Sequence, residues 1–145
     1  MPETEEKEKL SPKSVNVYQK LWFIQTNIKV PKNQYNNFGK YKYRSAEDIL
    51  TATVPFLKAC GAALVLNDEL IAVGAKIFVK ATAKLIDVKD GDAVESSALA
   101  ELCEHKGMSL DQCTGTASSY ARKYALNALL ALNDVQDSDY LKGMN

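Results

Sequence analysis

Residues 114–126 (TGTASSYARKYAL) combine small side chains, hydroxyl groups and an adjacent Arg–Lys pair. One face of a helix over this stretch carries Gly115, Ser118, Ser119 and Arg122, with Lys123 one step round. Small residues keep that surface low, and hydroxyl and guanidinium groups donate hydrogen bonds to phosphate oxygens. The face therefore suits a phosphate chain lying along the helix. Spacing alone leaves an alternative open, in which the small residues admit a neighbouring helix or strand and the cations form a solvated edge.

A second stretch, residues 31–44 (PKNQYNNFGKYKYR), mixes aromatic rings with basic side chains. Such a mixture is typical of surfaces that bind single-stranded nucleic acid, because bases stack on rings while cations neutralise phosphates. The alternative is a loop in which at least two of its four rings, Phe38 among them, pack on the core. The candidate nucleic-acid contacts in this stretch are Lys32, Tyr35, Lys40, Tyr41, Lys42, Tyr43 and Arg44.

The charge distribution supports a local attraction for a polyanion. The chain has a formal net charge of +0, yet residues 9–46 contain lysines and an arginine but no acidic residue. A neutral protein with such a segregated basic segment still attracts a polyanion locally. The sequence has no phosphate-binding loop of the ATPase type, so no use of ATP and no cofactor is expected.

The cysteines and the histidine do not form a metal site. Cys60, Cys103 and Cys113 lack metal-ligand spacing and resemble the reduced, buried cysteines of a cytosolic protein. His105 is the sole histidine and has no cysteine or carboxylate pattern around it. No apolar run approaches the roughly 20 residues that span a bilayer, so no contact with a membrane is expected.

The length of 145 residues predicts one domain, residues 13–145, after a disordered charged segment over residues 1–12. Ser11–Pro12 or Ser14 is expected to open a first helix, which must stop before Pro31. Its apolar stripe is Val17, Leu21, Ile24 and Ile28, widened by Tyr18 and Trp22.

A second helix is expected from Ser45, with Pro55 kinking it and Gly61 ending it. Three strands follow: residues 63–73 with a bend near Asn67–Asp68, residues 76–88, and residues 94–104. Residues 41–44 form a further short strand at the edge of this sheet, with the tyrosines on one face and the basic residues on the other.

Asp90–Gly91 predicts a tight two-residue hairpin between the second and third strands. That turn places Lys80 opposite Glu101 and Lys84 opposite Ser97. The outer face then carries a row of lysines offset by glutamates, which favours a solvated face. The buried face consists of Ile77, Val79, Ala81, Ala83, Leu85, Val94, Ser96, Ala98, Ala100 and Leu102.

The last helix is expected to start after Ser109, which forms a capping box with Gln112. The fold class is therefore α+β: a three-stranded antiparallel sheet packed on a long C-terminal helix, with helices before it. The predicted apolar stripe of that helix is Leu110, Cys113, Ala117, Ala121, Tyr124, Ala128 and Leu132.

Three motifs, in order, resemble the essential recombination function (ERF) family of phage and prophage single-strand annealing proteins. They are residues 33–49 (NQYNNFGKYKYRSAEDI), residues 114–126, and residues 134–139 (DVQDSD). More distantly, the helix with its basic pair followed by residues 136–142 is similar to the DNA-binding core of the eukaryotic mediator that anneals single strands. Members commonly carry a further C-terminal region that could contact a host single-strand-binding protein, whereas this sequence stops at Asn145.

The resemblance implies a β-β-β-α core that assembles into rings or helical filaments, with single-stranded DNA in a basic outer groove. It implies ATP-independent annealing of complementary strands during phage recombination in the cytoplasm of a bacterial host, and no enzymatic activity. Arg44, Arg122 and Lys123 are the positions matched to DNA-backbone contacts.

Two other classes of function stay open from the residues. The first is a metal-dependent nuclease using Asp134, Asp137 and Asp139, although carboxylates of two-metal sites normally converge from separate elements. The second is an interaction protein with no nucleic-acid role, which the basic and aromatic segment argues against.

Overall fold

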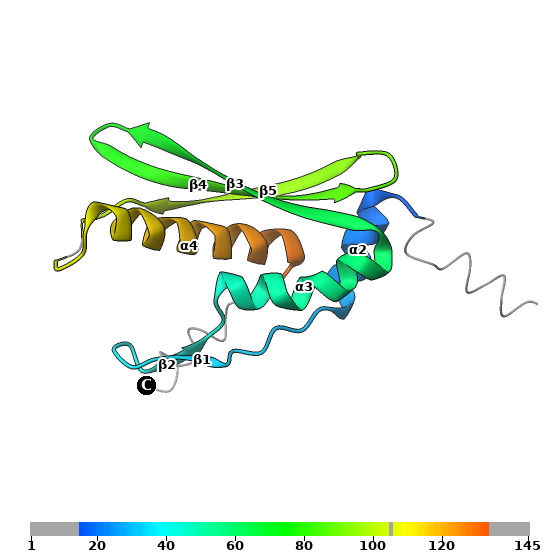
Figure 1. Cartoon of the computed structure of the whole chain (residues 1–145), viewed down its shortest axis with the longest axis horizontal. Helices are drawn as coiled ribbons and strands as arrows, with labels where there is room; N and C mark the ends of the chain where they lie inside the picture. The colour runs from blue at the N-terminus through cyan, green and yellow to red at the C-terminus, as the bar shows by residue number, and fades with distance from the viewer. Residues whose placement is uncertain (1–14, 105, 134–145) are drawn as a thin grey trace, which may run out of the picture.

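The computed structural model describes residues 15–104 and 106–133. At its centre is an antiparallel sheet with strand order β3-β4-β5, and helix α4 lies across one face (Figure 1). This arrangement confirms the predicted α+β class and the β-β-β-α core. The elements are β3 (Ala62–Val73), β4 (Lys76–Asp87), β5 (Ala93–Glu101) and α4 (Leu110–Leu130).

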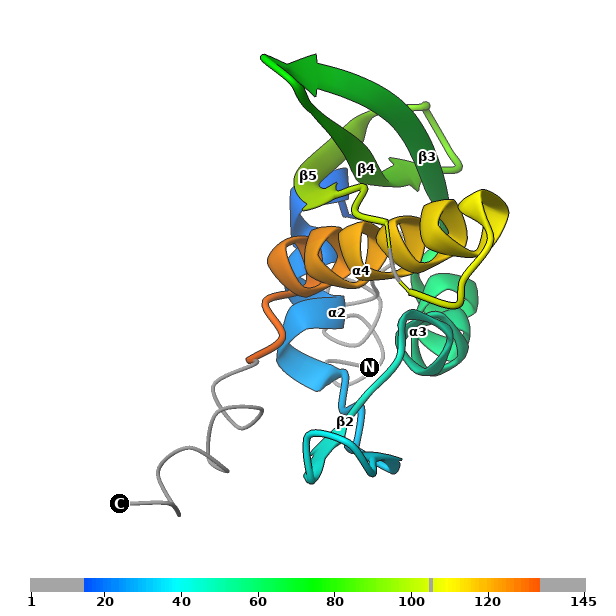
Figure 2. The same ribbon diagram turned by 90° about the vertical axis from the view of Figure 1, so that its left-hand side faces the viewer.

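The elements before the sheet complete the other side of α4. Helix α3 lies beyond α4 as seen from the sheet, and α2 runs past α4 to reach the sheet (Figure 2). A small hairpin extends from this side of the molecule, away from the sheet. The elements are α2 (Val17–Asn27), β1 (Gln34–Asn36), β2 (Tyr41–Tyr43) and α3 (Ala46–Cys60).

The β1–β2 hairpin is a two-stranded sheet of its own and does not edge the main sheet, so that prediction is wrong. Two further strand predictions also fail. Strand β3 runs through Asn67–Asp68 without a turn, and β5 ends at Glu101 instead of Glu104. Within the hairpin, Tyr35 pairs with Lys42, so the tyrosines of β2 lie on the face opposite Lys42, as predicted.

The register between β4 and β5 differs from the prediction by two residues. A shift of two preserves which side chains face the core, whereas a shift of one would reverse them. The inward face was therefore predicted correctly, and its β4 members Val79, Ala81, Ala83 and Leu85 are buried, although Ile77 is 45% exposed. The observed pairs are Lys80–Leu99 and Lys84–Glu95, in place of Lys80–Glu101 and Lys84–Ser97.

The turn between these strands explains the shift. The backbone N–H of Asp87 donates to the carbonyl of Asp92 at 2.7 Å, so residues 88–91 separate this pair, instead of the two residues of a tight turn. Gly91 adopts a φ of 80°, and its N–H donates to the Asp87 carbonyl at 2.8 Å. The side chain of Asp90 accepts from the N–H of Asp92 at 2.9 Å. Aspartate side chains thus build a longer turn than the Asp–Gly pair alone indicates.

The outer face of the sheet carries the predicted lysine row with acidic neighbours. Lys76 lies 3.8 Å from Glu101, and Lys80 lies 3.7 Å from Glu69. These pairs are exposed, so each contributes little to stability. The solvated-face interpretation agrees with this arrangement.

Local capping signals were read correctly for two helices. Ser45 and Ser109 are the N-caps of α3 and α4, each with a reciprocal capping box. Gly61 ends α3 in the left-handed conformation, with a φ of 73°. Helix α3 passes through Pro55 without being interrupted.

The first helix begins later than predicted. Asn16 is its N-cap and Gln19 completes the capping box, so neither Ser11–Pro12 nor Ser14 opens this helix. Tyr18 and Trp22 are 66% and 65% exposed and do not widen the apolar stripe. The helix ends at Asn27, before Pro31, as expected.

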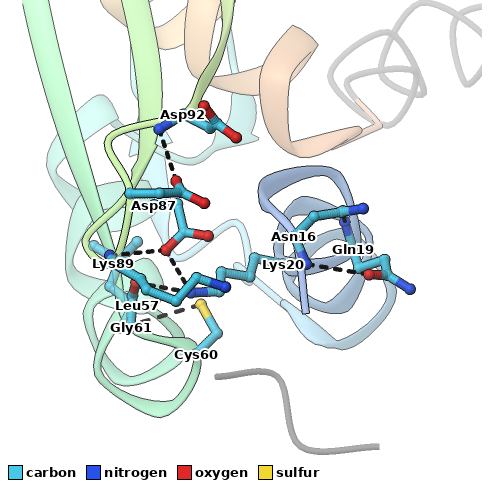
Figure 3. Close-up of polar contacts among 10 residues, drawn as sticks. Asn16, Gln19, Lys20, Leu57, Cys60, Gly61, Asp87, Lys89 and Asp92 are labelled. Carbon is cyan, nitrogen blue, oxygen red and sulfur yellow. Dashed lines mark hydrogen bonds and ion pairs between the residues drawn. The ribbon is translucent and has the colours of Figure 1, made fainter. Parts of the chain in front are cut away.

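Helix α2 is fixed to the sheet by a buried ion pair. Lys20 is 1% exposed, and its Nζ lies 2.8 Å from Oδ1 of Asp87, which is fully buried (Figure 3). The same ammonium donates to the carbonyl of Gly61 at 3.2 Å, and the N–H of Lys89 donates to the carboxylate at 2.9 Å. The Lys20 hydrogen bond is the main reason that the pKa of Asp87 lies below its ordinary value.

The apolar stripe of α4 was only partly predicted. Cys113, Ala117 and Ala121 are buried as expected, but Leu110 and Tyr124 are 71% and 46% exposed. Towards its C-terminal end α4 lies between the sheet and helices α2 and α3, so the buried arc widens to Ala125, Leu126, Asn127, Leu129 and Leu130. Cys103 is exposed, contrary to the expectation that all three cysteines are buried. No helix in the described ranges is long and apolar enough to cross a membrane.

Candidate functional site

A pocket of about 720 Å³ lies between the β1–β2 hairpin, the start of α3 and one side of α4. It therefore brings together the two stretches that the sequence singled out, residues 31–44 and residues 114–126. The contact across the pocket is between Lys123 and Tyr43: the ammonium lies 5.6 Å from the centre of the ring. A cation over an aromatic face within about 6 Å is attracted by the electrons of the ring. The lining residues are Asn36, Tyr41, Tyr43, Arg44, Ser45, Ala46, Glu47, Gly107, Met108, Gln112, Gly115, Thr116, Ser119, Tyr120 and Lys123.

On the α4 side of the pocket, Gly115 leaves the helix backbone uncovered because it has no side chain. A Cβ atom built on Gly115 would meet no atom within 4 Å, so the residue borders open space. Glycine inside a helix is less favourable than alanine by about 1 kcal/mol. Nothing in the described ranges packs closely on Gly115, so the alternative in which it admits a neighbouring element gains no support from them. Ser119 and Lys123 continue the same side of the pocket at helical spacing.

The hairpin side of the pocket presents two tyrosines. The rings of Tyr41 and Tyr43 meet edge to face at 6.0 Å between centroids. Both are half-buried, and together with Asn36 they line the pocket. Tyr35 and Lys42 lie on the opposite face of the hairpin because neighbouring positions of a strand alternate.

Arg44 lines the pocket, but its guanidinium is engaged inside the fold. The residue is 6% exposed, and Nη1 donates to the carbonyl of Val30 at 2.9 Å. Nη2 donates to the carbonyl of Asn133. Arg44 thus connects the base of the hairpin to the segment after α2 and to the segment after α4. This geometry favours a positioning role for Arg44 over a direct contact with a bound backbone.

Arg122 lies away from the pocket, although Lys123 lines it. Its Nε is 3.1 and 3.2 Å from the two carboxylate oxygens of Asp68 on β3. The hydroxyl of Ser118 donates to the same carboxylate at 2.5 Å. The side chain of Arg122 nevertheless remains 39% exposed. Adjacent helix positions point about 100° apart, so the Arg–Lys pair serves two neighbouring surfaces.

The N-terminus of α3 forms the third wall of the pocket. The side chain of Ser45 accepts from the N–H of Asp48 at 3.1 Å, and the N–H of Ser45 donates to Asp48 at 2.9 Å. This backbone hydrogen bond is the main cause that lowers the pKa of Asp48. The capping box thereby fixes the start of α3, where Glu47 adds one carboxylate to the wall.

Of the expected contact residues, Tyr41, Tyr43, Arg44, Ser119 and Lys123 line the pocket, whereas Lys32, Tyr35, Lys40, Lys42, Ser118 and Arg122 do not. The expected contacts did not include Asn36 and Tyr120, which line the pocket, or Asp68, which pairs with Arg122 outside it. For Asp68 a signal existed, because alternation along β3 places it on the same face as Ala62, Leu64 and Leu66. An acidic residue at an inward position needs a partner, which indicates a cation on the covering helix.

Metal binding receives no support from the described residues, which contain no group of three or more His, Cys, Asp or Glu side chains placed to hold an ion. The aspartates of the nuclease alternative, Asp134, Asp137 and Asp139, lie outside the described residues, as does His105.

Comparison of the sequence with known proteins identifies its family. The ERF superfamily model matches residues 17–145. The essential recombination function protein of Salmonella phage P22 is 47% identical over 127 residues, which cover 87% of this chain and 60% of that protein. The chain thus matches less than two thirds of the length of this relative. No solved structure matches the chain. Since the family match extends over both stretches that meet at the pocket, the chain belongs to the ERF superfamily.

Proposed function

We propose that this protein binds single-stranded DNA in the pocket between the β1–β2 hairpin and α4, and anneals complementary strands without ATP during phage recombination. The name of the phage P22 relative supports the recombination role. The observation that carries the proposal is the approach of Lys123 to the Tyr43 ring, across a pocket with Gly115 at its floor. Annealing requires no covalent chemistry, only a surface that neutralises phosphates and leaves bases accessible.

Each side of the pocket has a part in this function. Lys123 neutralises a phosphate as a mobile point charge, while Tyr41 and Tyr43 offer rings for base stacking. Ser119 donates a hydrogen bond to a phosphate oxygen. Arg122 serves a second phosphate from the adjacent surface, where Asp68 orients its guanidinium. Lys40 and Lys42 add positive charge around the hairpin.

We further propose that the protein works as a homo-oligomer, a ring or a helical filament. Strands β3 and β5 are the outer strands of the main sheet, and neither is paired on its outer side with another strand of the described chain. Next to β5, Tyr120 and Tyr124 stack at 6.3 Å between centroids, and each is 46% exposed. They line a second pocket of about 330 Å³ with Ala100 and Ala117. A monomeric mass at micromolar concentration with DNA present would reject this part of the proposal.

Binding and annealing are tested with labelled single strands, first without ATP or magnesium. We expect sequence-tolerant retention, and an affinity whose salt dependence has a slope of about −0.7 per neutralised phosphate. Adding a labelled complement should give duplex faster than the strands do alone. A control with magnesium addresses the nuclease alternative: shortened products would support that alternative, and salt-insensitive binding would reject the proposed interface.

A further inference from the structure

The tip of the β1–β2 hairpin presents an aromatic ring to solvent. Phe38 is 99% exposed, the highest value among the large hydrophobic residues of the described chain. The ring keeps its apolar surface in water in the free chain, so contact with a ligand would remove that surface from water. A ring in this position points to a binding role.

The tip is held in one conformation although it lies at the surface. Oδ1 of Asn36 accepts from the N–H groups of Phe38 and Gly39, both at 2.9 Å. Nδ2 of Asn36 donates to the hydroxyl of Tyr41 at 3.2 Å, and the N–H of Lys40 donates to the Asn36 carbonyl at 2.7 Å. Asn36 thus takes part in four hydrogen bonds, which fix the turn that carries Phe38.

Gly39 allows this turn to close under an aromatic ring. A Cβ atom at Gly39 would lie 2.4 and 2.7 Å from two ring carbons of Tyr41, so only glycine lets that ring lie against the turn. Lys40 adopts a φ of 56°, in the left-handed region that non-glycine residues seldom enter. A turn built with a required glycine and a left-handed lysine is preorganised to present what it carries.

The position of the tip relative to the pocket indicates its ligand. Asn36 and Tyr41 line the pocket, and residues 37–40 connect them, so Phe38 extends from the rim of the pocket. Lys40 of the same turn is exposed, and so is Lys42 in the strand that follows it. A ring flanked by cations fits a ligand with alternating planar and anionic groups, which is the chemistry of a single-stranded nucleic acid.

We propose that Phe38 inserts between neighbouring bases of the bound single strand and interrupts their stacking at one point per protomer. The inference rests on the proposed function, because it requires a strand in the pocket. Lys123 and Tyr43 hold the strand, whereas Phe38 sets where its base stack breaks. A break at each protomer would divide the strand into short stacked blocks.

The first experiment places a tryptophan at the tip. Trp22 is the sole tryptophan and lies on α2. In the Trp22→Phe, Phe38→Trp double variant, emission should be quenched at least twofold by oligodeoxythymidylate. It should not be quenched by an abasic oligomer of the same length, which keeps the phosphates. Equal responses to both oligomers would overturn the inference. A blue shift with rising protein concentration, without DNA, would also overturn it and would assign the tip to a second copy of the chain.

If the double variant does not fold, two single variants test whether Phe38 stacks on a base. Phe38→Ala and Phe38→Leu should both weaken binding of oligodeoxythymidylate by about tenfold, because stacking on a base requires a ring. Binding of the abasic oligomer should stay unchanged. Tyr18→Ala, which removes an exposed ring on α2, is the control and should bind as the native chain does. Native affinity for Phe38→Leu would reject stacking. If the native chain binds neither oligomer, the proposed function itself fails, and the inference fails with it.

Discussion

Arg122 on α4 and Asp68 on β3 form an ion pair that joins the long helix to an outer strand of the main sheet, with Nε 3.1 Å from Oδ1 and 3.2 Å from Oδ2. Ser118 donates to the same carboxylate, so one acidic side chain holds two residues of the helix. The partner of Arg122 therefore lies fifty-four positions earlier in the chain. It lies within the sheet.

Removing Asp68 should loosen α4 against β3. We expect Asp68→Ala to lower the free energy of unfolding by about 1–2 kcal/mol, since a hydrogen bond to a charged group and a partly exposed ion pair are lost together. Chemical denaturation measures this change. Glu69→Ala is the matched control, because Glu69 is 59% exposed and its pair with Lys80 is long at 3.7 Å. A comparable loss in both variants would contradict the role given to Asp68.

The same pair separates two roles for Arg122. If Arg122 meets a phosphate, Arg122→Ala should weaken strand binding by about 1–3 kcal/mol and lower the salt slope. Asp68→Asn should then strengthen DNA binding, because it removes a negative charge that repels the phosphates of the DNA. Affinity titrations at several salt concentrations, with the mass of the assembly measured on each variant, test this. Dissociation of an oligomer by Arg122→Ala before any loss of binding would refute the direct contact.

Lys123 should contribute more to binding than to folding. Lys123→Ala should reduce the salt slope by about 0.7 and weaken binding equally for different base sequences. Lys84→Ala is a control on the outer face of the sheet, where Lys84 lies opposite Glu95, and it should leave affinity unchanged. In thermal unfolding, Lys123→Ala should lose no more than the ~0.5–1 kcal/mol of its contact with the Tyr43 ring, and Lys84→Ala should be unchanged. An equal effect of both lysines would mean that binding follows overall charge and not the pocket.

Gly115 allows stability and binding to be changed in opposite directions. Gly115→Ala should stabilise α4 by about 0.5–1 kcal/mol, because its Cβ meets no atom within 4 Å and alanine is the better helix former. Gly115→Leu should fold as well but project into the pocket and weaken strand binding. Calorimetry and strand affinity on both variants check this. A destabilised Gly115→Ala would show that another segment packs on this position.

The buried pair of Lys20 and Asp87 should make stability depend on acid. The pKa of Asp87 lies below its ordinary value of 3.8, so its contribution is complete above that value and is lost as the pH falls from there through the lowered pKa. Lys20→Met leaves a buried carboxylate without its ammonium and should lower Tm by roughly 10 °C at neutral pH. In this variant the loss of stability in acid should be smaller than in the native chain. An unchanged acid transition would contradict this assignment.

Sequence reasoning succeeded where the determinants are local. The caps at Ser45 and Ser109, the stop at Gly61 and the inward face of β4 depend on residues a few positions apart. These signals were enough for the fold class. They also identified both stretches that meet at the pocket.

Two of the failures involve contacts between distant parts of the chain, and a third involves the turn between β4 and β5. Alternation along β3 places Asp68 on the inward face, but its pairing with Arg122 depends on how the sheet lies against α4, which no local pattern specifies. The buried arc of α4 widens because α2 and α3 cover its C-terminal half, so a single stripe could not describe it. The register between β4 and β5 depends on side-chain hydrogen bonds of Asp87 and Asp90 that lengthen the turn between these strands. In the first two cases tertiary packing outweighed a periodic pattern, and in the third the side chains of the turn did.

The ammonium of Lys20 has a consequence for the order in which the domain assembles. Its acceptors, Asp87 at the β4–β5 turn and Gly61 at the end of α3, are 67 and 41 positions away along the chain. A lysine leaves water at little cost only when such acceptors are already in place. Helix α2 can therefore dock only after that turn and the end of α3 have formed. Its amide protons should gain protection from hydrogen exchange last, and they report on completion of the whole domain.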